Sequence, residues 1–452
     1  MGQLHPGPHR EIRTNATRNG FAGEPFGFPR VFSSRYGFVA VGTRGRFGVL
    51  AAGALLIAVL FGACSDPLPR APFVVGAIYP LTGPQAQGGA QELAGVRASL
   101  TLARNDVQLR VISVETPAEA RAAVDRLVDR DHVPVILGTY GSTLAEAAAA
   151  RAEQRHVVYW ETGAVADVIT ERRSYVFRTV ATGSNLGQTA VEFTSQVLVA
   201  AAGVQNPAVR AVIVNVDDVY GRSVADGEQA LAAQLGIPVV DRIQYDPRAF
   251  DPYAIADRLA ADRADYLWDV SYIDDGVKIW QAITDRSVPL RAAVGTSSAF
   301  CMDEFSRRLG SRAVGVYAAD KPDSNVSSNA LTPAARDLLR RAQAAYGGNL
   351  SIPATAGFVG GWVLFHDVLP HLTGAVTPDG VRTVAYELDQ PNNSTINGGG
   401  LKFGGPTSSD PGQNLRAPSV VGQWQAVGKM RIVYPEAFAN SHSIIPSPSP
   451  AH

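Results

Sequence analysis

Polar residues suited to holding a small solute follow several apolar runs of the sequence. One such segment, residues 139–143, contains Tyr140, Ser142 and Thr143 and opens an Ala-rich stretch of helical character. Free backbone amides at a helix start, together with the two hydroxyls, can hold an anion such as a carboxylate. Ser142 could instead cap the helix, and one hydroxyl can do both. These three residues are therefore candidate ligand contacts.

A second candidate segment begins at Glu161, an isolated acid at the end of an apolar run. A charge in such a place is costly without a partner. Glu161 could receive a ligand ammonium or amide, and pairing with an Arg such as Arg178 would explain it equally well. The neighbouring Thr162 and Ala164 are candidate ligand contacts beside it.

The second half of the chain repeats this arrangement at three further apolar runs. The polar residues at their ends include Tyr220, Asp269, Tyr272 and Ser297. Ligands of open parallel sheets bind beyond the carboxyl ends of strands, and clefts between domains are favoured pockets. We therefore expect these four residues to line the site; packing at a helix start is the alternative for Tyr220.

Patterns typical of catalysis or of a cofactor site are weak. His366 and His371 are five residues apart, off the same-face spacing of a helical metal pair. Segment 141–143 lacks the Gly that follows the serine of a nucleophile elbow, and no Cys/His cluster has zinc spacing. Arg residues are dispersed among acids. We expect no enzymatic activity, no cofactor, no metal and no nucleic-acid partner.

The elements that must position these residues are alternating strands and helices. From Pro72 onward, short β-branched runs alternate with amphipathic helical stretches, first over about 73–180 and again over about 185–319. This order predicts parallel sheets flanked by helices. Each series holds four or five strands, so two similar α/β lobes are expected. A helical block over 332–389 and a last strand pair would complete them, with several crossings between lobes.

Charge divides the 452 residues into three parts, although the net charge is only −1. Residues 1–46 carry seven Arg against two Glu, and residues 47–63 carry no charge. Everything from Cys64 onward is mildly acidic. The apolar content of 46% is enough for a core and excludes a wholly disordered chain. A basic leader, an apolar run and an acidic body are typical of an exported protein.

The end of the apolar run resembles a bacterial lipobox. Leu60-Phe61-Gly62-Ala63-Cys64 matches it except at Phe61, where the motif usually has Leu. The resemblance implies a signal segment over 44–63 that is removed, and a diacylated Cys64 as the new N-terminus. A retained membrane helix is the alternative. Either way, the body is expected to be tethered at the outer face of the cytoplasmic membrane.

The flanks of this signal segment and the end of the chain are expected to have no fold. Residues 1–43 are too long and too rich in Pro and Gly for a normal leader, and an upstream start codon would explain them. Residues 64–71 are expected to be a linker. Residues 437–452 end in a low-complexity run and are expected to be an unstructured tail.

Ordered motifs across the body carry a family resemblance. The motifs are GAIYPLTG (76–83), VPVILGTYGST (133–143), HVVYWETGAVADVIT (156–170), YVFRTVATGS (175–184), VYGRSVADG (219–227), YDPRAFDPYAIADRLAADRAD (245–265) and VGQWQ with IVYP at the end. In this order they resemble the extracytoplasmic binding proteins for branched-chain amino acids, amides and urea, over roughly residues 72–436.

The resemblance implies the type I periplasmic binding protein fold, an α/β fold of two Rossmann-like parallel-sheet lobes joined by three hinge strands. The lobes would be 72–182 plus about 320–405, and 183–319 plus about 406–436. The ligand would lie in the cleft between them. By the same resemblance, Tyr220 would lie over the ligand and the loop around Ser142 would contact it.

One departure from the family pattern concerns the ligand. Amino-acid binders of this family commonly carry an acid for the ligand ammonium at the strand end that here reads Thr296-Ser297-Ser298. Its absence argues against an ordinary leucine, isoleucine or valine ligand. Glu161, Asp269 or Asp274 could take over that role from another direction; otherwise the ligand is an amide or another small polar compound.

The expected function is that of a lipid-anchored substrate-binding protein of an ABC importer. It would capture a small polar solute, such as an amino acid, an amide or a urea-like compound, by closing its lobes. It would then deliver the solute to a permease with its ATPase subunits. A sensor that reports the solute to a regulatory partner is the alternative.

Overall fold

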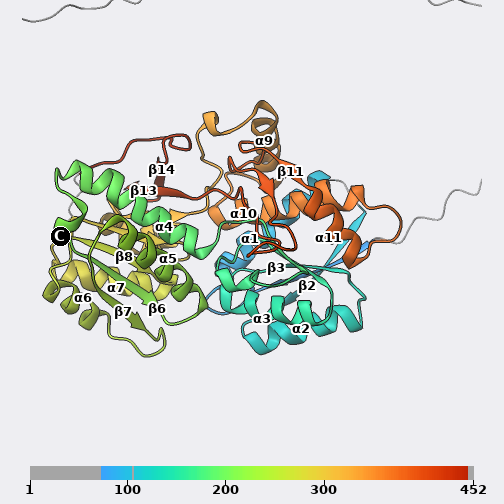
Figure 1. Cartoon of the computed structure of the whole chain (residues 1–452), viewed down its shortest axis with the longest axis horizontal. Helices are drawn as coiled ribbons and strands as arrows, with labels where there is room; N and C mark the ends of the chain where they lie inside the picture. The colour runs from blue at the N-terminus through green and yellow to red at the C-terminus, as the bar shows by residue number, and fades with distance from the viewer. Residues whose placement is uncertain (1–72, 104–105, 446–452) are drawn as a thin grey trace, which may run out of the picture. The chain divides into compact units, whose positions relative to one another are not determined.

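The computed structural model describes residues 73–103 and 106–445, all within one compact unit, Ala71–His452. The expected extension 1–43, the signal segment, Cys64 and the linker 64–71 lie outside the described residues, as does the end of the expected tail. The described part forms two α/β lobes, each built on its own sheet (Figure 1). The two-lobe prediction is therefore confirmed.

The first lobe is built on a parallel sheet with the strand order β2-β1-β3-β4-β5. Its strands are β1 (Phe73–Tyr79), β2 (Val107–Ser113), β3 (Val135–Gly138), β4 (Val158–Glu161) and β5 (Val176–Arg178). Its helices are α1 (Ala86–Ala103), α2 (Pro117–Asp129), α3 (Ser142–Gln154), α9 (Pro333–Tyr346), α10 (Ile352–Trp362) and α11 (Pro378–Glu387). Two apolar clusters cover the two faces of the sheet, one beneath α1 and α10 and one beneath α2 and α3.

Helix α10 packs against α1 with backbone in contact. A Cβ added at Gly95 of α1 would lie 1.9 Å from the carbonyl oxygen of Ala354, and one added at Gly357 would lie 2.0 Å from that of Glu92. Only glycine permits such an approach. The run Ile352–His371 is long and apolar enough to cross a membrane, but 83% of it is buried inside the protein, so it serves as a core helix.

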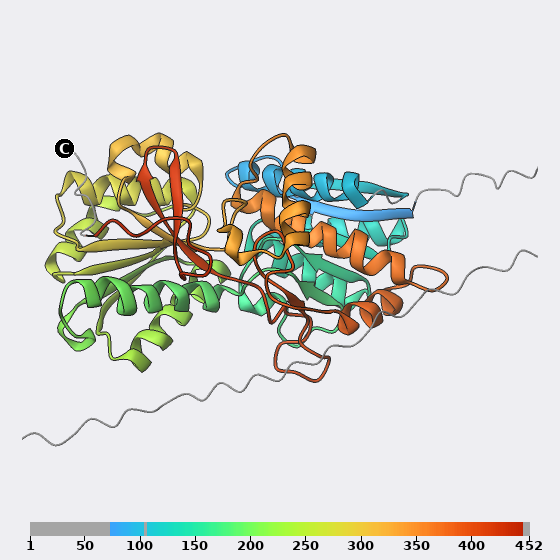
Figure 2. The same cartoon turned by 90° about the horizontal axis from the view of Figure 1, so that it is seen from above.

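The second lobe carries a seven-stranded sheet with the order β14-β13-β10-β9-β8-β6-β7. Its strands are β6 (Ala211–Val216), β7 (Val239–Tyr245), β8 (Tyr266–Val270), β9 (Ala292–Thr296), β10 (Tyr317–Asp320), β13 (Val420–Ala426) and β14 (Lys429–Tyr434). Its helices are α4 (Gly183–Phe193), α5 (Val219–Leu235), α6 (Pro252–Ala261), α7 (Ile273–Asp285) and α8 (Asp303–Leu309). The last two strands are antiparallel and extend this sheet (Figure 2).

The chain crosses between the lobes three times: after β5, after β10 and before β13. The first and third crossings are hydrogen-bonded to each other. The backbone amide of Arg178 donates to Gly412 at 2.9 Å, and the Asn414 side chain donates to the carbonyl oxygen of Thr179 at 3.0 Å. Asn414 thus still bonds to the first lobe, and the third crossing follows it rather than residue 405.

Residues 437–445, where we expected an unstructured tail, are bonded both to the second lobe and to the segment that follows β10. The backbone amide of Ile444 donates to the side-chain oxygen of Gln423 on β13 at 2.8 Å. The carbonyl oxygen of Phe438 accepts a bond from the amide of Ser327 at 3.0 Å. A short strand pair, β11 (Asp389–Gln390) with β12 (Leu401–Lys402), lies in the first lobe ahead of the third crossing.

Candidate functional site

Two small cavities lie where strand ends of the two lobes meet, with volumes of about 10 Å³ and 20 Å³. Each has room for about one water molecule. Both are lined by Tyr140 from the first lobe and by Tyr272 and Ser298 from the second. The remaining lining residues are Gly141, Ser142, Gly163, Ala164, Val165, Tyr220, Ser297 and Lys321 for the smaller cavity, and Pro84, Gln85, Gln87, Gly88, Ile273 and Met302 for the larger. We call these two cavities the cleft.

The loop before α3 supplies the first wall of the cleft. Gly141 has a φ of 97°, a left-handed conformation that favours glycine. It precedes α3 without a side-chain cap. The Ser142 hydroxyl accepts hydrogen bonds from the amides of Val165 and Ala166 at 3.3 Å and 3.1 Å, so it fastens the next loop instead of capping α3. The Tyr140 ring packs on Gly88, where any Cβ would clash with it.

Thr143 lies in the lobe interface rather than on the cavity wall. Its hydroxyl donates to a carboxylate oxygen of Asp218 in the second lobe at 3.3 Å. The same oxygen accepts the Tyr272 hydroxyl at 2.7 Å. A second bond between lobes runs from the Ser223 hydroxyl to Asp167 at 3.0 Å. These bonds hold the cleft closed, and the bridging role of Asp218 had no signal in the sequence beyond its place before a helix.

Glu161 is fully buried and does not line the cleft. Its carboxylate accepts bonds from the amides of Thr139, Gly163 and Ala164 at 3.0, 2.7 and 2.7 Å, and from the Tyr159 hydroxyl at 3.1 Å. Burial raises its pKa to about 7 in spite of these donors. Through these hydrogen bonds, Glu161 holds the loop after β4 in place behind the cleft.

Glu161 and Arg178, which we considered as an ion pair, do not pair with each other in the structure. Arg178 donates to Gln413 at 2.6 Å and to the carbonyl oxygens of Val165 and Ala166 at 3.0 Å and 2.6 Å. Arg178 therefore ties the loop after β4 to the third crossing.

Thr162 belongs to the same buried layer behind the cleft. Its hydroxyl bonds to Tyr79 at 2.8 Å and to Glu92 of α1 at 2.5 Å. Burial, and then the nearby Glu161 charge, raise the pKa of Glu92 well above its usual value. The second Glu92 carboxylate oxygen has no hydrogen-bond partner among the described residues. Nothing in the sequence of α1 distinguished Glu92 from an exposed acid.

The second lobe contributes an aromatic wall. The rings of Tyr220 and Tyr272 lie 5.3 Å apart, and the Tyr220 hydroxyl donates to the carbonyl oxygen of Thr296. Ser297, with a φ of 54°, lies beside them in the smaller cavity. Asp269 is fully buried behind this wall, bonded to Ser271, and burial raises its pKa to about 8.

Asp274, the other acid that we considered for the ligand ammonium, also lies away from the cleft. Its side chain is 61% exposed and pairs with Arg308 at 2.6 Å. Together with Glu161 and Asp269, it leaves the cleft without any of the three expected acids.

Lys321 is the functional residue that sequence reasoning missed. It follows β10 and is 5% exposed; its ammonium lies 3.0 Å from Asp320 and 3.4 Å from the carbonyl oxygen of Gly163 in the first lobe. Burial is the largest single influence and lowers its pKa, but Asp320, Cys301 and Glu92 together outweigh burial and raise it. Lys321 is the only charged side chain that lines the cleft among the described residues. A signal existed: the chain has four Lys, and this one directly follows a predicted strand.

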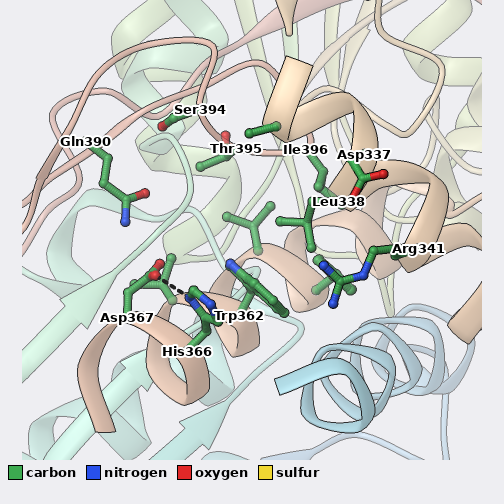
Figure 3. Close-up of a pocket in the computed structure, with 14 residues that line it drawn as sticks. Asp337, Leu338, Arg341, Trp362, His366, Asp367, Gln390, Ser394, Thr395 and Ile396 are labelled. Carbon is green, nitrogen blue, oxygen red and sulfur yellow. Dashed lines mark hydrogen bonds and ion pairs between the residues drawn. The ribbon is translucent and has the colours of Figure 1, made fainter. Parts of the chain in front are cut away.

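A larger cavity of about 350 Å³ lies within the first lobe, between α9, α10 and the segment 390–396 (Figure 3). It shares no lining residue with the cleft. We call it the lobe cavity. Within the described ranges, no group of His, Cys, Asp or Glu at either place could hold a metal ion.

Comparison with known proteins places this architecture in a family. A family model described as "Periplasmic binding protein" matches residues 72–429. Leu/Ile/Val-binding protein homolog 8 of Brucella abortus (strain 2308) is 28% identical over 371 residues, covering 80% of this chain and 90% of that protein.

Solved structures show the same fold. The leucine-binding protein LivK of Thermotoga maritima superposes with a TM-score of 0.68 at 16% identity, covering 80% of this chain and 97% of that one. A solute-binding protein of an ABC transporter from R. palustris, in complex with 4-hydroxybenzoate, gives 0.65 at 17%, covering 82% and 96%.

These proteins are binding proteins and not enzymes, in agreement with the expected lack of catalysis. The match of the family model over most of the described chain confirms the resemblance read from the ordered motifs. The chain therefore belongs to the periplasmic binding protein family.

Proposed function

We propose that this protein is the extracytoplasmic, lipid-anchored binding component of an ABC importer, which captures a small polar solute by closure of its lobes. The observation that carries the proposal is that both lobes contribute residues to the lining of the cleft. Tyr140, Ser142 and Ala164 from one lobe face Tyr220, Tyr272 and Ser297 from the other. A solute held by both sets stabilises the closed form, which a permease with its ATPase subunits can distinguish from the open one.

Capture requires the lobes to separate. The cleft, with cavities of about 10 Å³ and 20 Å³, is too small for an amino acid. Opening would break the bonds of Thr143 to Asp218 and of Ser223 to Asp167, and would draw Lys321 away from Gly163. The three crossings are the segments in which such a hinge motion would occur.

The charges of the cleft favour a solute that carries a carboxylate and no ammonium. Lys321 is cationic, and no Asp or Glu lines the cleft among the described residues. A solute ammonium would be repelled by Lys321, and Asp320, the partner of Lys321, does not line the cleft to receive it. A carboxylate would instead receive the Lys321 ammonium, a charge-assisted hydrogen bond. The complex of the R. palustris protein with 4-hydroxybenzoate illustrates a solute of this class on the same fold.

A matched set of solutes tests the proposal. Leucine, 4-methylpentanoate and 4-methylpentanamide share one carbon skeleton and differ in the ammonium and the carboxylate. Binding raises the free energy of unfolding with the logarithm of ligand concentration over Kd, by about 2.7 kcal/mol at 100 times Kd. We expect thermal unfolding to shift upward with 4-methylpentanoate or an aromatic carboxylate and not with leucine. A larger shift with leucine would overturn the ligand class; no shift with any solute of a broad panel would overturn solute capture itself.

The anchor is tested separately. Cys64→Ala removes the thiol that would carry the acyl chains, so we expect the protein to leave the membrane fraction. Cys301→Ala is the matched control, since Cys301 is buried and free. Unchanged membrane fractionation of Cys64→Ala would show that the apolar run 47–63 is itself retained as the anchor.

A further inference from the structure

We infer that the lobe cavity is a second ligand site, which takes a planar aromatic anion with a polar group at its far end. The cavity measures about 350 Å³, within the usual range of small-molecule sites. All its lining residues come from the first lobe, between Ala334 and Ile396. Its shape therefore does not depend on lobe closure, in contrast to the cleft.

One wall of the lobe cavity is a row of flat rings. Phe358, Trp362 and His366 follow one another at four-residue spacing along α10 and the π-helical turn η6 (Val363–Val368). The Trp362 and His366 rings are stacked 4.1 Å apart at 16°, and Phe358 lies parallel to Trp362 at 6.0 Å. Because these rings cover one another's faces, the row leaves mainly ring edges for a ligand, and an aromatic ring can pack against them edge-to-face. π-Helical turns are rare and occur frequently at functional sites.

The polar groups around this wall have no protein partner. Among the described residues, the Arg341 guanidinium and the Gln390 side-chain amide make no hydrogen bond or ion pair, and the Ser394 hydroxyl is buried without a partner. A buried hydroxyl left unpaired is destabilising, because its desolvation is not compensated by a hydrogen bond. Arg341 and Gln390 lie on opposite sides of the Trp362 ring (Figure 3). A ligand that spans the ring would reach both.

The carboxylates at the rim are already engaged, which sets the charge of the ligand. Asp337 pairs with Arg340 at 2.6 Å, and Asp367 is hydrogen-bonded to Nδ1 of His366 at 2.7 Å. Arg341 thus remains as the unpaired charge of the cavity. A guanidinium binds a carboxylate through two parallel hydrogen bonds. The ligand class is therefore an aromatic carboxylate whose distal hydroxyl or amide bonds to Gln390 and Ser394.

Tryptophan fluorescence can report on this cavity alone. Of the five Trp in the chain, Trp160, Trp268, Trp280 and Trp424 are buried and Trp362 is partly exposed in the cavity wall. A probe that lies on Trp362 changes its emission and shields it from acrylamide. Trp362→Phe identifies the part of the signal that comes from this residue.

The test titrates the full chain with 6-hydroxy-2-naphthoate, against 2-naphthol, which lacks the carboxylate, and 2-naphthoate, which lacks the hydroxyl. We expect saturable protection of Trp362 by the hydroxynaphthoate and weaker binding of both analogues. Arg341→Met should weaken binding by about tenfold or more, the loss expected for a charge-assisted pair. The matched control is Arg336→Met, because Arg336 lies on the same helix, donates to the carbonyl oxygen of Ser328 and does not line the cavity.

Lys321→Met separates this site from the cleft. Protection of Trp362 that persists in Lys321→Met and is lost in Arg341→Met supports the second site. Absence of saturable protection, equal binding by Arg341→Met and Arg336→Met, or loss of protection in Lys321→Met would each overturn it. Failure of the cleft to bind any solute would leave this result unaffected, since none of its readouts uses the cleft.

Discussion

The cleft and the lobe cavity differ in what satisfies their polar groups. In the cleft, the hydroxyls of Thr143 and Tyr272 are bonded to Asp218, and Lys321 bridges Asp320 and Gly163. In the lobe cavity, Arg341, Gln390 and Ser394 have no partner within the described part of the chain. Closure itself thus completes the cleft, so a solute competes there with bonds between protein groups. A ligand of the preformed cavity has no such competitor.

The two places also differ in volume, and the difference has a lesson for locating sites. The cleft between the lobes is nearly filled, at about 10 Å³ and 20 Å³, whereas the cavity inside one lobe keeps about 350 Å³. The volume measured in one conformation therefore does not tell which of the two places is the better candidate for solute capture. The origin of the lining residues is more informative, because both lobes line the cleft and only one lobe lines the cavity.

The largest effect expected is at Lys321. Lys321→Met should weaken binding of a carboxylate solute to the cleft by about 30-fold or more, since a buried charge-assisted bond is lost. Lys321→Arg keeps the charge and should retain part of the affinity. Lys402→Met is the control, because Lys402 lies on the surface beside Asp389. Titration calorimetry with the carboxylate that stabilises the wild type measures all three.

A structural explanation of such a loss is tested by a double variant. Lys321→Met leaves Asp320 buried without its ion pair. Adding Asp320→Asn removes that charge. If the double variant regains the wild-type affinity, Lys321 does not contact the solute, and the contrast between cleft and cavity loses its electrostatic basis.

The next effect concerns the buried acids behind the cleft, which the lobe cavity lacks. Burial raises the pKa of Asp269 from 3.8 to about 8. The folded chain therefore binds more protons than the unfolded chain between about pH 4 and pH 8, and the free energy of unfolding falls as pH rises through that window. Asp269→Asn cannot ionise, so we expect it to be more stable than the wild type at pH 8.5, by roughly 1–3 kcal/mol.

Urea unfolding at pH 5 and pH 8.5 measures this difference. At pH 5 the difference should be clearly smaller, because pH 5 lies near the lower end of the window, where ionisation of Asp269 in the unfolded chain has only begun to favour unfolding. Asp274→Asn is the matched control, since Asp274 is 61% exposed. Parallel pH profiles for wild type and Asp269→Asn would contradict the prediction.

A smaller effect is expected from the bond between the lobes. Thr143→Val keeps the shape of the side chain and removes the hydroxyl that donates to Asp218 at 3.3 Å. The closed form loses one hydrogen bond and becomes less stable relative to the open form, so we expect affinity for the solute to fall by about two- to fivefold. Small-angle scattering without solute should show a larger radius of gyration. Thr101→Val, which removes a bond inside α1, should change neither.

The smallest effect is expected from the lobe cavity on the cleft. Arg341→Met should leave the affinity of the cleft for its solute unchanged, because the two places share no lining residue. Calorimetry on the same protein samples checks this. A change comparable to that of Lys321→Met would mean that the two regions are not separate.

The sequence located the cleft because the carboxyl ends of parallel strands carry recognisable polar residues. Tyr140, Ser142, Ala164, Tyr220 and Tyr272 were all predicted and all line it, as does Ser297. Alternation of strands and helices is a local property, so the two lobes were predictable as well. The boundary of the third crossing was not, because residues 412–414 bond to a strand that lies far away in the sequence.

The sequence does not reveal in which direction a side chain points at the end of a strand. Glu161, Thr162 and Asp269 occupy the expected turns, yet they face amides and hydroxyls behind the cleft instead of its interior. A carboxylate can be satisfied by three backbone amides of its own loop, and residue type does not reveal this. Lys321 was missed because it belongs to no recognisable motif, although lysine is rare in this chain and its position after a strand was therefore a signal.

Helix α10 lines the lobe cavity and also contacts the buried layer behind the cleft. A Cβ on Gly360 would touch Thr162 behind the cleft, whereas Trp362, two residues later, faces the lobe cavity. Gly95 and Gly357 leave no space between α10 and α1. A single methyl group added at Gly357 would therefore shift both sites together, while changes at Lys321 or Arg341 reach one of them. During evolution, the cleft and the lobe cavity can therefore change independently only as long as Gly95 and Gly357 are kept.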